Sequence, residues 1–520
     1  MNEDGMSYLD MAVAAASGNV SELANLYWSP IYPAILAIVF RCFAVSPPSE
    51  FLFTHMVNVG IGLFALGSFT FFLKAYLGHT ADTDLSRNRR RSTIVLGYAL
   101  FLWSLIQTSA VAAVSPDLLS GGLSFLAAGF CFRLIRDSPK GAHVGNSIAL
   151  GTVLGAAAWT KAALLPLGVA LLVVLFVTQR RVLRCVLPSK AVTALLVTFL
   201  AILAPLVAVM SRKANKITFG ESGRINYAWM VQAEIPRLFG WTKASPSTGV
   251  PRHPPRVLNE QPTVFEYAGT TPGTYPPWYD PAYFHEGLRL RFHVRNQIQA
   301  LWLSFNELRW GHGRSVLILV PGLVLLWIRT NRLRAVQTLR RNAWLLFWVI
   351  FAFAMYSVVL TQPRYVTAFL VMFWLLLFDA AAGAAWGKLS EIVLALVSVG
   401  LVAIPSTVAI LSPPARVAPH LEVATKLAES GLIAGDSVAL IGRGYDAYFA
   451  HLARLKIIGE VEEPDSFWAL DPVRARAISD KLRGAGAKVV VSPRGCPEQS
   501  QIEGWQNLEK TGFCVLRLRP

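Results

Sequence analysis

The chain opens with two adjacent carboxylates, Glu3 and Asp4, followed by Gly5 and a helical pattern over residues 8–24. A carboxylate at a fixed position can accept a proton from an attacking hydroxyl group or orient that group. It can also bind a divalent metal ion. We therefore take Asp4, with Glu3 beside it, as the first candidate for chemistry. The alternative for Asp4 is structural, because an aspartate before a helix is a common N-cap.

Other charged residues lie at the ends of the apolar segments that must position them. Asp117 follows Pro116, and we interpret it as a second acid, which shapes a site or binds a metal ion, or as an N-cap. Lys161 and Arg364 carry charges that suit a phosphate group, or they are interface cations whose side chains reach to the membrane surface. Arg224, within a long polar insertion, is a weaker phosphate-binding candidate.

The cysteines and histidines form no recognisable metal or redox motif. The chain has five cysteines and no CxxC pair. Cys496 and Cys514 lie in the same polar C-terminal region and are either a disulfide or two unrelated thiols, since sequence alone does not set their distance. His285 and His293 are eight residues apart, which matches no metal-ligand spacing.

The composition indicates a polytopic membrane protein. Of the 520 residues, 54% are hydrophobic and only 15% are charged, too few for the surface of a soluble protein of this length. The net charge of +17 comes largely from basic residues in short loops between apolar runs. That pattern reports membrane topology rather than nucleic-acid binding. We expect membrane lipids as partners and no nucleic acid.

The apolar runs predict about ten transmembrane helices, because a span needs roughly 20 apolar residues. A shorter run over residues 31–45, interrupted by Arg41, reads instead as a helix along the membrane surface. The ten predicted spans are 51–74, 93–114, 118–135, 144–159, 162–178, 191–210, 315–328, 343–360, 366–385 and 392–411.

Basic loops set the orientation of these spans. Four of them fall on one face under this alternation, and that face is the cytoplasm. The other face receives Asp4, Asp117, Lys161, Arg364 and the C-terminal region. An even number of spans then places the N-terminus outside as well, so either a first span precedes Asn2 or the short tail is exported. The basic loops are 87–91, 133–140, 180–190 and 329–341.

Two regions lie outside the spans. The insertion over residues 211–309 is too long for a simple connector, and its prolines and aromatics, dense over 273–281, predict an ordered extended loop over the membrane face. From residue 415 strands alternate with helices, which predicts a small α/β domain. We therefore expect an external loop with surface helices at 1–50, a transmembrane domain at 51–411 and an extracytoplasmic α/β domain at 415–520.

Four local features resemble the GT-C superfamily of membrane glycosyltransferases, in particular its protein-mannosyltransferase-like and aminoarabinose-transferase-like branch (glycosyltransferase family 39). They are Glu3-Asp4-Gly5 opening an external loop, surface helices before the next span, the Pro116-Asp117 turn, and Arg364-Tyr365 at an external helix end. The resemblance covers about the first 385 residues. It implies a mainly α, multi-pass fold in the cytoplasmic (inner) membrane. The family's first span has no counterpart in the sequence.

The resemblance also implies a function. Members of this superfamily transfer a sugar from a polyprenyl-phosphate donor to a lipid or glycan acceptor on the outer face of the membrane. An aspartate of the first external loop acts there as base or metal ligand, and that position corresponds to Asp4. A divalent metal is the one cofactor this allows. Two alternatives stay open: a transporter or flippase of a lipid-linked or anionic solute, and a non-catalytic membrane scaffold. The absence of a visible internal repeat disfavours transport.

Overall fold

The structure of the chain is a computed structural model with two compact units, each described here by itself. One unit contains Met1–Val57, Gln232–Arg291 and Pro414–Pro520, and the other contains Asn58–Val231 and Phe292–Pro413. The structure describes residues 2–80, 87–108, 110–136, 143–178, 188–232, 248–267, 272–311, 313–328, 330, 332–382, 388–411, 419–497, 502, 504–508 and 511–518. Most of the predicted basic loop 180–190 and part of loop 133–140 lie outside these residues.

A helix occupies each of the ten predicted spans. Four described helices, over Pro47–His79, Asp117–Arg136, Ser189–Ala214 and Ser390–Leu411, are long and apolar enough to cross a membrane. The number of spans that cross stays a prediction. The ten helices are α3 (Glu50–Thr80), α4 (Arg87–Gln107), α5 (Asp117–Arg136), α6 (His143–Thr160), α7 (Leu164–Thr178), α8 (Ser189–Ala214), α13 (Val316–Ile328), α15 (Ala343–Ser357), α16 (Thr367–Ala382) and α17 (Lys388–Leu411).

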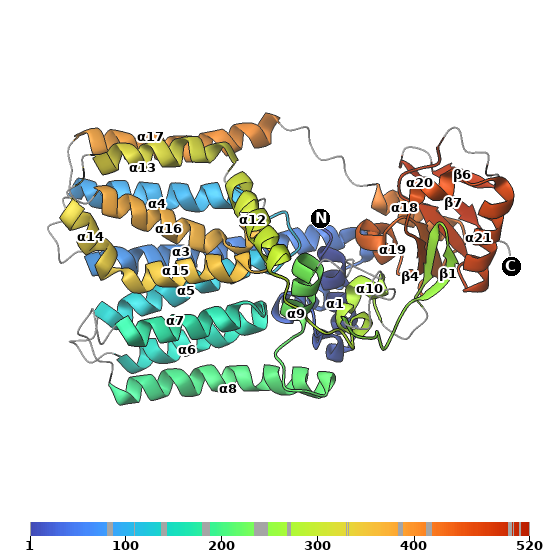
Figure 1. Ribbon diagram of the computed structural model, residues 1–520, viewed down its shortest axis with the longest axis horizontal. Helices are drawn as coiled ribbons and strands as arrows, with labels where there is room; N and C mark the ends of the chain where they lie inside the picture. The colour runs from blue at the N-terminus through green and yellow to red at the C-terminus, as the bar shows by residue number, and fades with distance from the viewer. Residues whose placement is uncertain are drawn as a thin grey trace. The chain divides into compact units, whose positions relative to one another are not determined.

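Small residues let these helices pack closely. Helix α6 packs against α5 and α8, and α4 lies beside α16 and α17 (Figure 1). A Cβ atom at Gly151 of α6 would lie 2.6 Å from the backbone oxygen of Leu195 in α8, so the two backbones touch. This is a common way for apolar helices to associate. The same unit contains α9 (Ser222–Tyr227), α12 (Val294–Gly311) and α14 (Arg332–Arg341), and α14 carries much of the basic loop 329–341.

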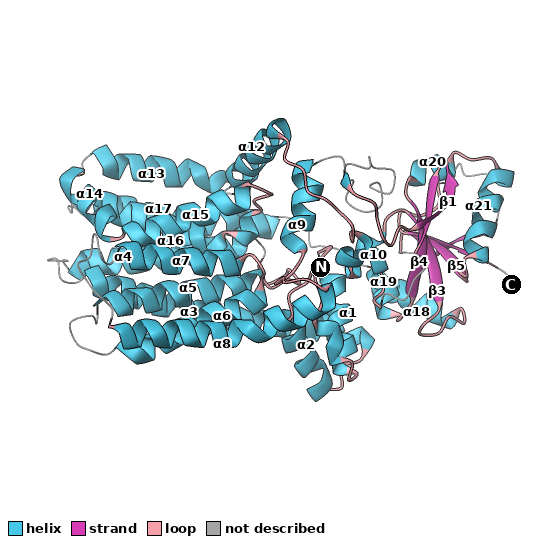
Figure 2. Ribbon diagram, turned by 60° about the horizontal axis from the view of Figure 1, so that its bottom comes forward, coloured by secondary structure: helices cyan, strands magenta, loops and turns pink. Residues whose placement is uncertain are grey.

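The other unit is built on a seven-stranded sheet with strand order β1-β2-β4-β3-β5-β7-β6. The central strands β4, β3 and β5 are parallel, and the outer pairs are antiparallel. Figure 2 shows the strands with α20 and α21 beside them. The strands are β1 (Arg256–Glu260), β2 (Thr263–Glu266), β3 (Ser437–Ile441), β4 (Lys456–Val461), β5 (Val489–Ser492), β6 (Trp505–Leu508) and β7 (Phe513–Arg517).

Strand–helix alternation in the C-terminal region is confirmed, and the insertion adds to it. Strands β1 and β2 come from the insertion and pair onto β4, which the sequence did not indicate. Of the two alternatives for Cys496 and Cys514, the structure contains the disulfide. The helices of this unit are α1 (Gly5–Ala16), α2 (Ile31–Cys42), α10 (Pro276–Tyr279), α11 (Pro281–Phe284), α18 (His420–Glu429), α19 (Tyr448–Leu452), α20 (Pro464–Trp468) and α21 (Pro472–Gly484).

Candidate functional site

Three of the predicted site residues meet in the helical unit. Lys161 Nζ lies 2.5 Å from Asp117 Oδ1, and Arg364 Nε lies 3.5 Å from Asp117 Oδ2. The ammonium group of Lys161 also lies 3.5 Å from the centre of the Tyr365 ring, a cation–π contact. The two cations and the acid, far apart in sequence, thus form one cluster.

Local structure at helix ends positions each member of this cluster. Asp117 is the first residue of α5, and the hydroxyl of Ser115 donates a hydrogen bond to its Oδ2 at 3.1 Å. Lys161 directly follows α6. Arg364 lies in a single 3₁₀ turn before α16 and donates from Nε to Gln362 Oε1 at 2.8 Å. The helix ends, not flexible loops, therefore fix the three charges.

The cluster attracts anions. Only 8% of the Asp117 side chain is exposed, against 21% for Lys161 and for Arg364. One carboxylate against two cations leaves one net positive charge, partly shielded from water, where charge–charge interactions are stronger than in bulk solvent. A phosphate group suits this environment. A divalent metal ion at Asp117 does not fit, because it would face both cations at close range.

An apolar pocket reaches the charged cluster. Asp117 and Arg364 line it together with side chains from α3, α4, α5 and α16. The free space inside the pocket is about 20 Å³, enough for a water molecule, so apolar side chains fill most of the region beside the cluster. The other residues that line the pocket are Ala65, Phe101, Ser104, Leu105, Thr108, Ala110, Ala113, Ser115, Leu118, Gly121, Gly122, Phe125, Thr367 and Ala368.

Arg224, the fourth predicted cation, belongs to a different cluster of the same unit. Its Nε donates to Glu221 Oε2 at 2.7 Å, and Lys216 Nζ lies 2.9 Å from Glu221 Oε1. Glu221 is buried, so two cations compensate its charge. These contacts give Arg224 a structural partner, and its role in phosphate binding stays a prediction.

In the α/β unit, the N-terminal acidic pair sits on a well-held turn. Asp4 occupies the N-cap position of α1, but its side chain makes no capping hydrogen bond, so the geometry does not support the structural alternative. The indole of Trp278 donates to the backbone oxygen of Glu3 at 3.0 Å. The hydroxyl of Tyr448 donates to the backbone oxygen of Asn2 at 2.6 Å. The insertion and the C-terminal region thus both hold the turn that carries Asp4.

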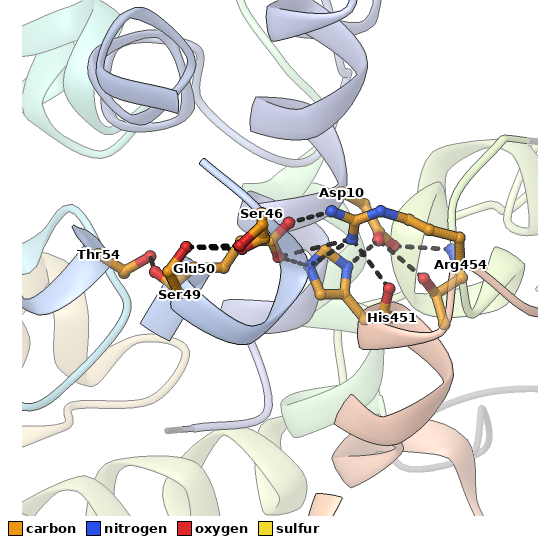
Figure 3. A network of polar contacts seen from close by, with 8 residues as sticks. Asp10, Ser46, Ser49, Glu50, Thr54, His451 and Arg454 are labelled. Atoms are coloured by element: carbon orange, nitrogen blue, oxygen red, sulfur yellow. Dashed lines mark hydrogen bonds and ion pairs between the residues drawn. The ribbon is translucent and has the colours of Figure 1, made fainter. Parts of the chain in front are cut away.

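A buried charge network in this unit was not visible in the sequence (Figure 3). The two ring nitrogens of His451 lie 2.6 Å from Asp10 Oδ1 and 2.8 Å from Glu50 Oε2, and Arg454 pairs with Glu50 as well. Contact with a carboxylate at both nitrogens requires both to carry protons, so the ring is an imidazolium. Burial lowers the pKa of His451, but the hydrogen bonds to the two carboxylates outweigh this and raise it.

The network fixes the start of the chain. Asp10 also accepts hydrogen bonds from the backbone and hydroxyl of Thr274, at 2.7 and 2.8 Å. Helix α1, the start of α3, the insertion and α19 are therefore joined through one imidazolium. An acid at the start of an apolar run, as at Glu50, was the one available signal, because such a group is retained only with a partner. Within the described residues, no cluster of three or more histidine, cysteine, aspartate and glutamate side chains could hold a metal ion.

Comparison with known proteins identifies the fold. No family known from sequence matches this chain, and the search of curated proteins found no significant relative. The structure of ArnT from Cupriavidus metallidurans bound to undecaprenyl phosphate is similar, with a TM-score of 0.52 and 12% identity, over 95% of this chain and 88% of that chain. In its apo state the same protein gives a TM-score of 0.50 and 13% identity.

A second solved protein shares the architecture. The Archaeoglobus fulgidus oligosaccharyltransferase, tethered to an acceptor peptide, gives a TM-score of 0.52 at 9% identity; 95% of this chain covers 65% of that one. Both proteins have the GT-C fold, so the predicted resemblance is confirmed at the level of fold. With the apolar helices, it indicates a multi-pass membrane protein.

Proposed function

We propose that this protein is a membrane glycosyltransferase that moves a sugar from a polyprenyl-phosphate donor to a lipid or glycan acceptor, on the outer face of the cytoplasmic membrane. The observation that carries the proposal is the cluster of Lys161, Arg364 and Asp117, which adjoins an apolar region of the helical unit. The two cations suit the phosphate of such a donor, and apolar side chains lie beside them. Support comes from the fold, which ArnT shares in its complex with undecaprenyl phosphate.

Lys161 and Arg364 receive the phosphate in this proposal. Without a donor, Asp117 holds the two cations near each other and offsets their repulsion. When the donor binds, its phosphate oxygens compete with Asp117 for both cations. During transfer the bond between the anomeric carbon and the phosphate oxygen breaks, and its electron pair stays on the phosphate. The cations stabilise that growing charge, which is the usual largest contribution to such catalysis.

Asp4 is the proposed base, with Glu3 beside it. An acceptor hydroxyl forms the new bond to the anomeric carbon, and its proton passes to the carboxylate of Asp4. The turn that carries Asp4 is held through the backbone oxygens of Asn2 and Glu3. The charges around Asp117 do not fit a divalent metal ion, so Asp4 and Glu3 are the carboxylates that would hold one in this proposal.

The test is sugar transfer in membranes supplied with a pool of labelled polyprenyl-phosphate sugars, scored as label leaving the lipid. We expect Lys161→Met to lower the rate roughly 100-fold or more, the usual scale for losing one stabilising group in the transition state. Asp4→Asn should abolish transfer without changing membrane insertion. Lys213→Met is the matched control, because Lys213 is exposed in the last turn of α8 and lies outside the cluster.

The outcomes separate the alternatives. Equal transfer by Lys161→Met and Lys213→Met would remove the phosphate-binding role of Lys161. Full activity of Asp4→Asn would leave Asp117 as the acid to test next. No transfer by the wild-type protein, under conditions in which it retains undecaprenyl phosphate, would contradict the glycosyltransferase proposal and favour transport of a lipid-linked solute.

A further inference from the structure

A crevice of about 720 Å³ opens in the α/β unit at the carboxyl ends of its parallel strands. The chain leaves β3 toward β4 on one side and leaves β5 toward β6 on the other, beyond β7, so the connections after β3 and β5 diverge. In open α/β sheets, ligands bind at such a divergence. The volume is within the range of small-molecule sites.

The residues after each central strand line this crevice. Arg443 follows β3, Glu462 follows β4 and Arg494 follows β5. Because β7 is antiparallel to β5, Phe513 at its start reaches the same edge, where the adjacent disulfide from Cys514 fixes it. Three strand ends and a covalent bond therefore shape the crevice, rather than a single loop.

Hydrogen-bonding groups of both kinds face the crevice. Arg443 Nη2 lies 3.0 Å from Glu462 Oε1, so this pair offers donors and acceptors together. His420 contacts Phe513 edge to face, and burial lowers the pKa of His420 to about 4, which leaves the ring neutral near pH 7. In the part of the chain that the structure describes, the buried Nδ1 of His420 has no hydrogen-bond partner.

Arg494 is the second cation that lines the crevice, together with the carboxylates of Glu462 and Asp446. Arg494 is exposed, and no carboxylate among the described residues forms an ion pair with it. Arginine binds carboxylate and phosphate groups through paired hydrogen bonds. The ring of Pro464, by contrast, suits the C–H surface of a sugar ring.

We propose that this crevice binds an acidic sugar, whose carboxylate or phosphate pairs with Arg494 and whose hydroxyl groups bond to the Arg443–Glu462 pair. The site involves none of the residues assigned to donor binding. That the crevice holds the acceptor of sugar transfer rests on the proposed function. The binding of an acidic sugar to the crevice does not depend on that function. The C-terminal α/β unit then supplies specificity for a glycan.

Saturation-transfer NMR on the full chain in detergent tests this inference with three probes: glucuronate, glucose 6-phosphate and glucose. We expect signal from at least one acidic sugar and a weaker signal from glucose. Arg494→Gln should weaken the binding of that acidic sugar at least tenfold. Arg474→Gln is the matched control, because Arg474 is an exposed arginine of α21 outside the crevice. It should bind as the wild type does.

Two results would overturn the inference: no signal from any probe, or equal affinities of the wild type and Arg494→Gln. The two acidic probes distinguish a carboxylate from a phosphate as the anion. The transfer assay on the same preparations separates this inference from the proposed function. Probe binding without sugar transfer leaves the crevice site supported and contradicts the glycosyltransferase proposal. Sugar transfer without probe binding supports the glycosyltransferase proposal and contradicts the crevice site.

Discussion

Glu460 of β4 makes the stability of the α/β unit depend on pH. Its side chain is fully buried; Tyr275 donates its hydroxyl to Oε2 at 2.8 Å and the backbone of Gly444 donates at 3.3 Å. Burial raises the pKa of Glu460 to about 7, although hydrogen bonds from Tyr275 and Tyr267 lower it in part. The carboxyl group of Glu460 therefore stays protonated up to about neutral pH.

The direction and the size of this pH dependence follow from the difference between the folded and unfolded pKa values of Glu460. Because the folded pKa lies above the ordinary value of 4.5, the folded state binds the proton more tightly. The resulting stability is present in full below pH 4.5 and is lost as pH rises through about 7. The two pKa values differ by about 2.5, and each pKa unit corresponds to about 1.36 kcal/mol. The loss of unfolding free energy is therefore about 3 kcal/mol.

Glu460→Gln should remove this dependence. The amide oxygen can take the place of Oε2 and accept from Tyr275 and Gly444. The amide nitrogen then takes the place of Oε1, a buried atom without a partner among the described residues, where the protonated acid would carry its hydroxyl. We expect the variant to match the wild type at pH 4.5 and to exceed it by up to about 3 kcal/mol at pH 8.

Hydrogen exchange of amides in β3 and β4, corrected for the intrinsic pH dependence of exchange, measures the opening free energy of this sheet. The wild-type value should fall between pH 5 and 8, and the difference between variant and wild type should grow over the same interval. Taking that difference cancels other groups that titrate in the unit. Parallel pH profiles for the two proteins would refute the assignment of the titration to Glu460.

Two further predictions concern the same unit. His451→Gln should destabilise the unit most below about pH 6.5, because the stability that the wild type gains from the raised pKa of His451 is lost as pH rises through the folded pKa. Thermal melting at several pH values tests this. A decrease in melting temperature that is the same at every pH would contradict it. Gly444→Ala should cost about 1–3 kcal/mol, because the new Cβ would lie 2.6 Å from the buried Tyr275 ring. Gly484→Ala is its control, with open space at the same position, and equal stability of the two variants would contradict the packing argument.

The helices and the charged cluster were accessible from sequence for one reason. Apolar runs have a length that the membrane sets, so their ends are known to within about two turns. Asp117, Lys161 and Arg364 each lie at such an end, on the face assigned to the outside. Charged residues at helix ends on one face can meet without any long-range pattern in the sequence. The α4 helix shows the limit of precision, since its predicted span continued past its end at Gln107.

Long-range pairing was not accessible. Strand β2 carries only four residues, and its partner β4 lies almost 200 positions later, as the pair Val264 and Val461 illustrates. Short strands of this kind have no local signal that names a partner. The contact of Glu50 with His451 spans a separation of 401 residues. In sequence, Glu50 stands out as an acid at the start of an apolar run, but nothing identifies His451 as its partner.

The fold therefore places the proposed base under the control of residues far along the chain. Asn2 and Glu3 are held through their backbone oxygens by Tyr448 and Trp278, and α1 is anchored through Asp10. A short acidic turn alone would have too many conformations to hold a carboxylate for catalysis, and each contact removes part of that freedom. The insertion and the C-terminal region thus act as the support of the N-terminal acid. Its position at the start of the chain does not make it peripheral to the structure.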